Sequence, residues 1–448
     1  MARLVYVRII VVAMLAFASA HGVSAQFTAQ NVELTPQAKD AYVAIGAQAL
    51  VKKGLAFLED DAAKTLDDQK IMTAIPAPPF KEAKRAEYFR NRLQELGLQD
   101  VRLDSEGNAI GVHRGSGGGP KLVISAHLDT VFPEGTDVSI KEKDGRLYAP
   151  GIADDTRGLA ELLSIIRALN HTGLKTVGDV WFVGTVGEEE LGDLRGVKAL
   201  FRDQKDIDGF ITIESPGGGV NALGQINVGS RRFRVTFKGP GGHSFGAFGL
   251  PSAIHAMGRA IAKISDIQTP SNPKTTFTVG TVAGGISTNS IAGEAAMQID
   301  MRSSENSALQ ALEAEVLEHI QKSVAEENAR WGATSMTVDI KLVGDRPAGK
   351  IPMDSPMFQA AAPSLELLGL RKPSFYSGSN DANLPASLGI PATRLSSGGR
   401  SGGTHTFQEW YEPTLSHQGP QVSFLTMLGL VGIEGVSQPI LPKRPPRP

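Results

Sequence analysis

The sequence contains no cysteine among its 448 residues. Disulfide bonds are therefore excluded, and so is a lipoprotein anchor, which needs a lipidated cysteine. Any metal that the protein binds must be held by nitrogen and oxygen atoms, because no thiolate ligand exists. A metal site has to be sought among histidine, aspartate and glutamate side chains.

A surplus of positive charge is also lacking. The chain has 45 lysine and arginine residues against 47 aspartate and glutamate residues, for a formal net charge of −2. Proteins that bind nucleic acid carry a basic face, so we expect no nucleic-acid partner. Hydrophobic residues make up 41% of the chain, which is enough for a large core and, at this length, for more than one domain.

The apolar run near the N-terminus is too short to span a bilayer. It extends from Ile9 to Ala18, whereas a membrane helix needs roughly 20 apolar residues. Arg3 and Arg8 come before it, and Val23-Ser24-Ala25 has the small-residue pattern that signal peptidase cleaves. Residues 1–25 are therefore predicted to be a secretory signal. We expect export to a periplasm or to the cell exterior, without a stable membrane anchor.

At the other end, residues 437–448 are short of apolar side chains. They contain five prolines together with Lys443, Arg444 and Arg447. A segment of this composition buries too little apolar surface to offset the entropy of ordering. We therefore predict a disordered, basic and proline-rich tail.

Three short β-rich runs lead into residues of the types that bind metals. The runs span residues 122–124, 180–183 and 210–213, and they are followed by His127 and Asp129, by Glu188 and Glu189, and by Glu214. Runs of this kind are typical of buried strands in a parallel sheet. Open α/β sheets bind ligands just beyond the carboxyl ends of their strands, so these side chains are predicted to share one site.

Strand-like and helix-like segments alternate up to about residue 228. Helical periodicity is clear at 158–170, where leucine and isoleucine residues form one apolar stripe. The alternation predicts the α/β class, with a mostly parallel sheet flanked by helices. We assign residues 26–229 to the first part of a catalytic domain.

The pattern changes between residues 230 and 345. Strands are predicted at 233–237, 276–282, 296–301 and 336–342, and helices at 252–264 and 309–324. Their order is β-α-β-β-α-β, which is the ferredoxin-like α+β arrangement. Residues 230–345 are therefore predicted to be an inserted domain. The α/β pattern then returns, and residues 346–436 are assigned to the second part of the catalytic domain.

His127 and Asp129 share a face of an extended backbone, because alternate residues of a strand point the same way. Asp129 can then orient the imidazole of His127, as carboxylates do for zinc-bound histidines. A capped loop is the alternative for this pair taken alone.

Adjacent acids elsewhere in the chain have two interpretations. Asp154 and Asp155 precede a predicted helix, where aspartate is a favoured N-cap, but one of the two can also bridge a pair of cations. Glu188 and Glu189 belong to an acidic triplet, which is otherwise typical of solvated surface. After a buried strand, one glutamate can be a metal ligand and its neighbour a base that takes a proton from metal-bound water.

His405 follows a glycine-rich stretch and supplies a second imidazole. By itself such a histidine is more often structural. With the other residues it completes a set of two imidazoles, one bridging carboxylate and two terminal carboxylates. That set suits two zinc ions roughly 3.5–4 Å apart, with cobalt or manganese as alternatives.

Five motifs resemble the co-catalytic zinc hydrolase family that includes peptidase T, glutamate carboxypeptidase, acetylornithine deacetylase and succinyl-diaminopimelate desuccinylase. They are Ser125-Ala126-His127-Leu128-Asp129-Thr130-Val131, Gly151-Ile152-Ala153-Asp154-Asp155, Glu188-Glu189, Gly241-Gly242-His243-Ser244 and Gly403-Thr404-His405-Thr406. The resemblance extends from about residue 60 to about residue 435. The chain departs from the usual pattern at Thr156-Arg157 and at Glu190.

The resemblance implies a role for each site residue. His127 and Glu214 would hold one zinc ion, Glu189 and His405 the other, and Asp154 would bridge both. Glu188 would be the general base, and Asp129 the carboxylate that orients His127.

Three further residues are implied to bind substrate. His243 lies at the start of the inserted domain, where the family uses a histidine to contact substrate or the oxyanion, often in the site of a neighbouring subunit. Asn289 matches a substrate-contacting asparagine of the family. Arg302 can hold a substrate carboxylate through paired hydrogen bonds, with a structural salt bridge as the alternative.

The function implied is a secreted dinuclear-zinc metallopeptidase that hydrolyses amide bonds of small peptides by metal-activated water, closest in pattern to peptidase T-like exopeptidases. Glu214 favours the alternative of an N-acyl amino acid deacylase or glutamate-type carboxypeptidase, because the family tends to place aspartate there in aminopeptidase-like members. A non-catalytic metal-binding protein is a third alternative, which the retention of Glu188 disfavours. The family usually dimerises through its inserted domain, so a homodimer through residues 230–345 is expected.

Overall fold

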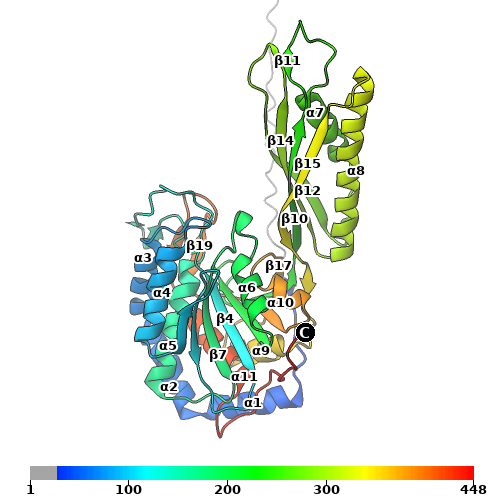
Figure 1. Cartoon of the computed structure of the whole chain (residues 1–448). Helices are drawn as coiled ribbons and strands as arrows, with labels where there is room; N and C mark the ends of the chain where they lie inside the picture. The colour runs from blue at the N-terminus through cyan, green and yellow to red at the C-terminus, as the bar shows by residue number, and fades with distance from the viewer. Residues whose placement is uncertain (1–27) are drawn as a thin grey trace, which may run out of the picture.

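A computed structural model describes residues 28–448, and the predicted signal segment 1–25 lies outside them. Figure 1 shows two bodies: a wide one with helices around a central sheet, and a slender one in which two helices lie along a second sheet. The chain leaves the first body, forms the second and returns.

The wide body is built around a six-stranded sheet with the order β18-β8-β4-β7-β3-β2. Its strands are β2 (Gln99–Leu103), β3 (Ala109–His113), β4 (Lys121–His127), β7 (Asp179–Thr185), β8 (Gly209–Glu214) and β18 (Ala392–Ser396). β18, β8, β4 and β7 are parallel, whereas β3 and β2 are added antiparallel at one edge. The predicted mostly parallel sheet is confirmed. The three runs that lead into polar residues are the neighbouring strands β8, β4 and β7.

Helices cover both faces of this sheet (Figure 1). Along β4, Leu122 and Ile124 pack into one core, while Val123 packs into the core on the opposite face. Burial on both sides explains why the strands are apolar runs without polar alternation. The helices of this body are α1 (Pro36–Ala47), α2 (Ala49–Asp60), α3 (Ala62–Thr73), α4 (Ala83–Glu95), α5 (Thr156–Thr172), α6 (Arg195–Asp203), α9 (Pro356–Leu367), α10 (Asn383–Ser387) and α11 (Gln418–Val431).

Two smaller sheets flank the central one. The first has the order β1-β17-β9-β16, formed by β1 (Thr28–Ala29), β9 (Ala222–Asn227), β16 (Gly349–Lys350) and β17 (Ser374–Gly378). The second has the order β19-β20-β6-β5, formed by β5 (Lys141–Lys143), β6 (Arg146–Tyr148), β19 (Arg400–Gly402) and β20 (Trp410–Glu412). Pairing of β6 with β20 places the segment before Asp154 beside the segment after His405.

The slender body is the inserted ferredoxin-like domain expected from the sequence. Its sheet is antiparallel with the order β12-β14-β10-β15. The strands are β10 (Gly229–Lys238), β12 (Thr275–Gly284), β14 (Glu294–Ser303) and β15 (Thr337–Arg346), the helices are α7 (Ala253–Ser265) and α8 (Asn306–Trp331), and a small two-stranded sheet is formed by β11 (Gly242–His243) and β13 (Ser290–Ile291). The two helices and the sheet enclose a separate hydrophobic core.

The prediction of a disordered tail is wrong. Ile440 and Leu441 are buried against the large core, and their backbone N–H groups donate to carbonyl groups at the end of α11. Arg447 then donates from Nη2 to the carbonyl of Gln204 at 3.0 Å, just past the end of α6. Two apolar residues and one helix-capping arginine thus order a segment whose overall composition is that of a flexible tail.

Among residues 28–448, no single helix is long and apolar enough to cross a membrane. Only α1 and α2 taken together reach that length and composition, and they are bent by 72° at their junction.

Candidate metal centre

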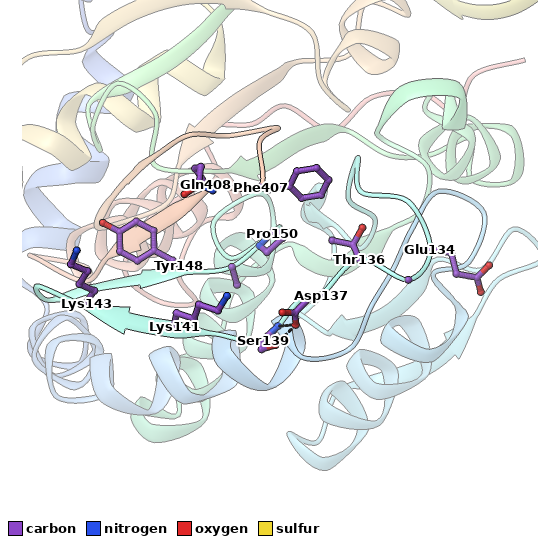
Figure 2. Close-up of a pocket in the computed structure, with 12 residues that line it drawn as sticks. Glu134, Thr136, Asp137, Ser139, Lys141, Lys143, Tyr148, Pro150, Phe407 and Gln408 are labelled. Carbon is purple, nitrogen blue, oxygen red and sulfur yellow. Dashed lines mark hydrogen bonds between the residues drawn. The ribbon is translucent and has the colours of Figure 1, made fainter.

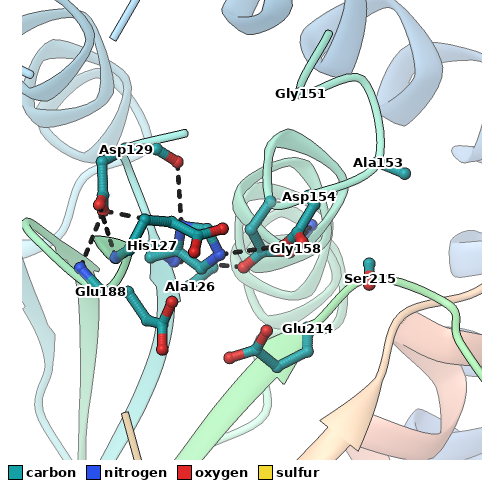
Figure 3. Close-up of polar contacts among 12 residues, drawn as sticks. Ala126, His127, Asp129, Gly151, Ala153, Asp154, Gly158, Glu188, Glu214 and Ser215 are labelled. Atoms are coloured by element: carbon teal, nitrogen blue, oxygen red, sulfur yellow. Dashed lines mark hydrogen bonds and ion pairs between the residues drawn. The ribbon is translucent and has the colours of Figure 1, made fainter. Parts of the chain in front are cut away.

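The predicted site residues gather where β4, β7 and β8 end. His127 is the last residue of β4 and Glu214 the last residue of β8, while Glu188 and Glu189 lie in the turn after β7. Figure 3 shows the side chains of His127, Asp154, Glu188 and Glu214 grouped in front of the strand ends. The shared edge of a parallel sheet is what brings together segments that are far apart in the sequence.

Asp154 lies between two histidine rings. Its Oδ1 atom is 3.1 Å from Nε2 of His127, and its Oδ2 atom is 3.3 Å from Nε2 of His405. His405 Nε2 is also 2.9 Å from Oε1 of Glu189. One ligand atom each from His127, Asp154 and Glu189 lies within 4.8 Å of the others. A carboxylate whose two oxygens face two different imidazoles has the arrangement needed to bridge two cations.

Asp129 supports the centre in two ways. Its backbone carbonyl lies 3.0 Å from Nδ1 of His127, whereas its carboxylate is 3.7 Å from that nitrogen. The carboxylate instead accepts the backbone N–H groups of Glu188 at 3.1 Å and Glu189 at 2.8 Å. A proton on Nδ1 satisfies the carbonyl and leaves Nε2 free for a cation. Asp129 therefore orients His127 mainly through its backbone, and it holds the Glu188-Glu189 turn through its side chain.

Of the two adjacent aspartates, Asp155 is the helix N-cap and Asp154 faces the histidines. Asp155 is the N-cap of α5 and accepts the N–H of Gly158 at 3.2 Å. Its other oxygen accepts the N–H of His127, also at 3.2 Å. The N-cap thus leaves Asp154, one residue earlier, to face the histidines.

Glu409 is a site residue that the sequence reasoning missed. Its buried carboxylate accepts the backbone N–H groups of Gly151 at 3.1 Å, Ala153 at 2.8 Å and Asp154 at 3.0 Å. Burial, followed by the charge of Asp154, raises the pKa of Glu409 to about 7. Glu409 lies four residues after His405, so it ties the Asp154 loop to the segment that carries the second imidazole. The sequence did hold a signal for Glu409, because an acid a few residues after a candidate metal ligand can hydrogen-bond to the ligand or to its loop.

Arg346 was also missed. Its Nη1 atom lies 3.0 Å from Oε1 of Glu188, and its Nη2 atom donates to the carbonyl of the same residue. The exposed fractions of the Arg346 and Glu188 side chains are 5% and 7%. Arg346 ends β15, the last strand of the inserted domain, and no local pattern marks it.

The electrostatics of the centre favour a bound cation. Burial, opposed by the hydrogen bond to His405 and reinforced by the charge of Glu188, raises the pKa of Glu189 to about 7. Burial likewise raises the pKa of Glu214. Hydrogen bonds to Asp154 and Glu189 raise the pKa of His405 to about 11, because carboxylates surround this ring. Buried carboxylates that repel one another, next to imidazoles, form the donor set that suits divalent cations.

The three predicted substrate-binding residues lie elsewhere, in the inserted domain. His243 is exposed, and its Nδ1 accepts the N–H of Phe245 at 3.2 Å. Asn289 is exposed, and its Oδ1 accepts the hydroxyl of Ser287 at 2.6 Å. Arg302 donates from Nε to Asp300 at 2.7 Å. For Arg302 this geometry agrees with the structural salt bridge, and a substrate role for all three stays a prediction.

The chain spans about half the length of the first curated relatives that it matches. Carboxypeptidase G2 of Pseudomonas sp. (strain RS-16) is 24% identical over 233 residues, which are 50% of this chain and 55% of that protein. Cysteinylglycine-S-conjugate dipeptidase of Corynebacterium striatum is 30% identical over 211 residues, which are 43% of this chain and 46% of that protein.

Solved structures match over a longer range. Aminopeptidase PepT of Bacillus cereus ATCC 10987 has a TM-score of 0.65 at 24% identity, and a tripeptidase of Staphylococcus aureus subsp. aureus mu50 has a TM-score of 0.68 at 23% identity. Each match covers 82% of this chain and 97% of the other, and establishes the shared fold. The sequence profile of peptidase family M20/M25/M40 matches residues 123–428, which include every residue of the candidate centre. The chain therefore belongs to peptidase family M20/M25/M40.

Proposed function

We propose that the protein is a metal-dependent hydrolase of amide bonds in small peptides, acting as a peptidase T-like exopeptidase with two zinc ions. The observation that carries this proposal is the position of Asp154, whose two oxygens lie 3.1 Å and 3.3 Å from Nε2 of His127 and His405. Family membership and the names of the aminopeptidase and tripeptidase of similar fold support the same reaction class.

The residues present fit a two-ion site. His127 and Glu214 would hold one ion, Glu189 and His405 the other, and Asp154 would bridge them. The raised pKa values of Glu189 and Glu214 support this assignment, because cations would neutralise carboxylates that burial otherwise destabilises. Nitrogen and oxygen ligands of this kind also accept cobalt or manganese.

When bound, the ions lower the pKa of a water molecule and polarise the substrate carbonyl. Glu188 is the base that takes the proton from the attacking water at a carboxylate oxygen. It then returns this proton to the leaving amine nitrogen, which completes amide hydrolysis. The Asp129 carboxylate accepts the backbone N–H of Glu188, and Arg346 forms an ion pair with the Glu188 side chain. Both contacts hold Glu188 in place.

A second candidate function is an N-acyl amino acid deacylase or glutamate-type carboxypeptidase. Glu214 and the similarity to carboxypeptidase G2 favour it. The two candidates differ in which end of the substrate must be free. A non-catalytic metal-binding protein is less compatible with Glu188, since binding alone needs no base beside the ligands.

The deciding experiment strips the protein of metal and assays hydrolysis before and after addition of zinc, cobalt or manganese. The substrates are dipeptides and tripeptides, the same peptides blocked at the amino or the carboxyl end, and N-acetyl amino acids. Metal-restored cleavage of carboxyl-blocked peptides, in which only the amino end is free, supports the peptidase T-like exopeptidase. Cleavage of amino-blocked substrates alone supports the deacylase or carboxypeptidase, and no cleavage with any metal contradicts both.

We also propose a homodimer formed through residues 230–345. Phe245, Phe248 and Ile286 are large apolar residues of this domain that are 89%, 77% and 95% exposed. Dimerisation would cover them and would bring His243 of one subunit toward the centre of the other, where it would contact substrate together with Asn289 or Arg302. A monomer in sedimentation equilibrium would contradict this proposal. Export to a periplasm or the cell exterior is proposed on the N-terminal sequence pattern, and fractionation of the cells tests it.

A further inference from the structure

A cavity of about 780 Å³ lies between the β5–β6 hairpin, the loop around residues 134–139 and the segment just after His405 (Figure 2). Its volume is large enough for a side chain or a terminal residue of a peptide. None of the residues that line it is among the proposed metal ligands.

Three walls of the cavity continue directly from segments of the metal centre. The loop at Glu134 begins five residues after Asp129, Pro150 lies four residues before Asp154, and Phe407 lies two residues after His405. The ring centroids of Phe132 and Phe407 are 5.6 Å apart, so the segments that follow Asp129 and His405 contact each other here. A substrate held at the centre therefore has this cavity beside it.

The charged side chains that line the cavity differ in whether groups of the protein already bind them. The Glu134 carboxylate pairs with Lys81, and Figure 2 shows it turned away from the other side chains. The Asp137 carboxylate accepts the backbone N–H of Ser139 at 2.9 Å and also its hydroxyl. These bonds, with a smaller effect of Lys141, lower the pKa of Asp137. Both acids are thus already engaged by groups of the protein.

The ammonium groups of Lys141 and Lys143 remain available. Both are exposed, and among residues 28–448 no carboxylate oxygen forms an ion pair with either within 4.0 Å. Apolar surface lines the same cavity: Pro150, the ring of Tyr148 and the ring of Phe407, which is 66% exposed. The cavity therefore combines an apolar wall with free positive charge.

We infer that this cavity binds the part of the substrate that carries a free carboxylate, with Lys141 and Lys143 as its partners and Phe407 against its apolar body. The inference rests on the proposed function. It narrows the substrates to peptides and acyl amino acids that carry a free carboxylate, either at the carboxyl end or on a side chain. A terminal carboxylate and a side-chain carboxylate share this chemistry.

The test uses metal-loaded protein carrying Glu188→Gln, so that binding is measured without turnover. Calorimetry compares alanyl-alanyl-phenylalanine with its carboxamide, and then with alanyl-alanyl-glutamic acid α-carboxamide, whose carboxylate is on the side chain. We expect the free acid to bind about tenfold more tightly than the carboxamide, because two partly exposed ion pairs are lost with the charge. Adding Lys141→Gln and Lys143→Gln should abolish that difference and leave the affinity for the carboxamide unchanged.

The control is the pair Lys39→Gln and Lys52→Gln, two exposed lysines of α1 and α2. It should preserve the preference for the free acid. Equal binding of acid and amide, or failure of the free acid to bind, overturns the inference. An equal loss of affinity for the free acid and for the carboxamide in the Lys141 and Lys143 variant also overturns it. Turnover of the peptides by protein with Glu188 intact is measured separately, so failure of the proposed function is distinguished from failure of the carboxylate site.

Discussion

The carboxylate of Glu188 forms a buried ion pair with the guanidinium of Arg346, at 3.0 Å between Oε1 and Nη1. The pair crosses from the catalytic domain to the last residue of the inserted domain's sheet. The carboxylate that we propose as the base is thus held by a cation from the end of β15, the last strand of the inserted domain. The position of the inserted domain and the orientation of Glu188 are linked by this contact.

Replacement of Glu188 by glutamine tests its role as base. The amide keeps the size of the side chain and can still contact Arg346, but it cannot accept a proton. We expect kcat to fall by about 10²- to 10⁴-fold while the metal content stays unchanged. The matched control is Glu190→Gln, an exposed acid two residues away, which should keep wild-type turnover. Near-wild-type activity of Glu188→Gln would remove the assignment.

Replacement of Arg346 by methionine should destabilise the folded protein. Removal of one partner of a buried ion pair leaves an uncompensated charge, here on Glu188, and such losses cost about 3–5 kcal/mol. The free energy of unfolding of the metal-free protein in urea measures the effect. The control Arg202→Met breaks an exposed pair with Asp203 and should leave the urea midpoint nearly unchanged. An equal effect of both substitutions would mean that burial of the Arg346 pair has no energetic importance.

Replacement of Glu409 by glutamine should weaken metal binding. The carboxylate accepts three backbone N–H groups from the loop that carries Asp154, and an amide replaces one accepting oxygen by a donor. We expect metal affinity to fall by about 10- to 100-fold, as for other residues that support a ligand. Competition with a chelator measures the dissociation constant. The control is Glu412→Gln, three residues later, whose carboxylate pairs with Arg146 at 3.1 Å instead of with the Asp154 loop; this variant should bind metal like the wild type.

Residues that act at strand ends could be predicted from the sequence, and residues that act through remote hydrogen bonds could not. His127 and Glu214 follow apolar runs, and parallel pairing of β4 with β8 brings such ends together whatever the loops do. Arg346 contacts Glu188 from 158 positions away, and no periodicity encodes that contact. The divided roles of Asp154 and Asp155 were likewise open, because an N-cap and a ligand have the same residue type.

The C-terminal segment 437–448 is a second case in which the sequence pattern did not predict the structure. Its proline content predicts disorder, yet Ile440 and Leu441 find a place in the core beside α11. Composition averages over a segment, whereas packing depends on whether two particular side chains fit a particular gap. The inserted domain was predictable because the apolar faces of its strands and helices pack against one another and form a core of their own.

Glu161 offers a prediction of pH dependence away from the metal centre. It is fully buried in α5, where its Oε1 accepts the hydroxyl of Ser423 at 2.6 Å. Burial, opposed in part by Arg157, raises its pKa from 4.5 to about 7. Between these values the unfolded chain loses the proton while the folded protein keeps it. The contribution of Glu161 to stability is therefore fully present below pH 4.5 and declines as the pH rises toward about 7.

The Glu161→Gln variant lacks this titration, so its stability relative to the wild type should increase across the same range, by up to about 3 kcal/mol. Urea unfolding of metal-free protein at several pH values measures the difference. Glu59→Gln, at an exposed position on α2, should follow the wild-type curve. Parallel curves for Glu161→Gln and the wild type would mean that the buried carboxyl ionises as readily in the fold as in the unfolded chain, so that Arg157 offsets the whole cost of its burial.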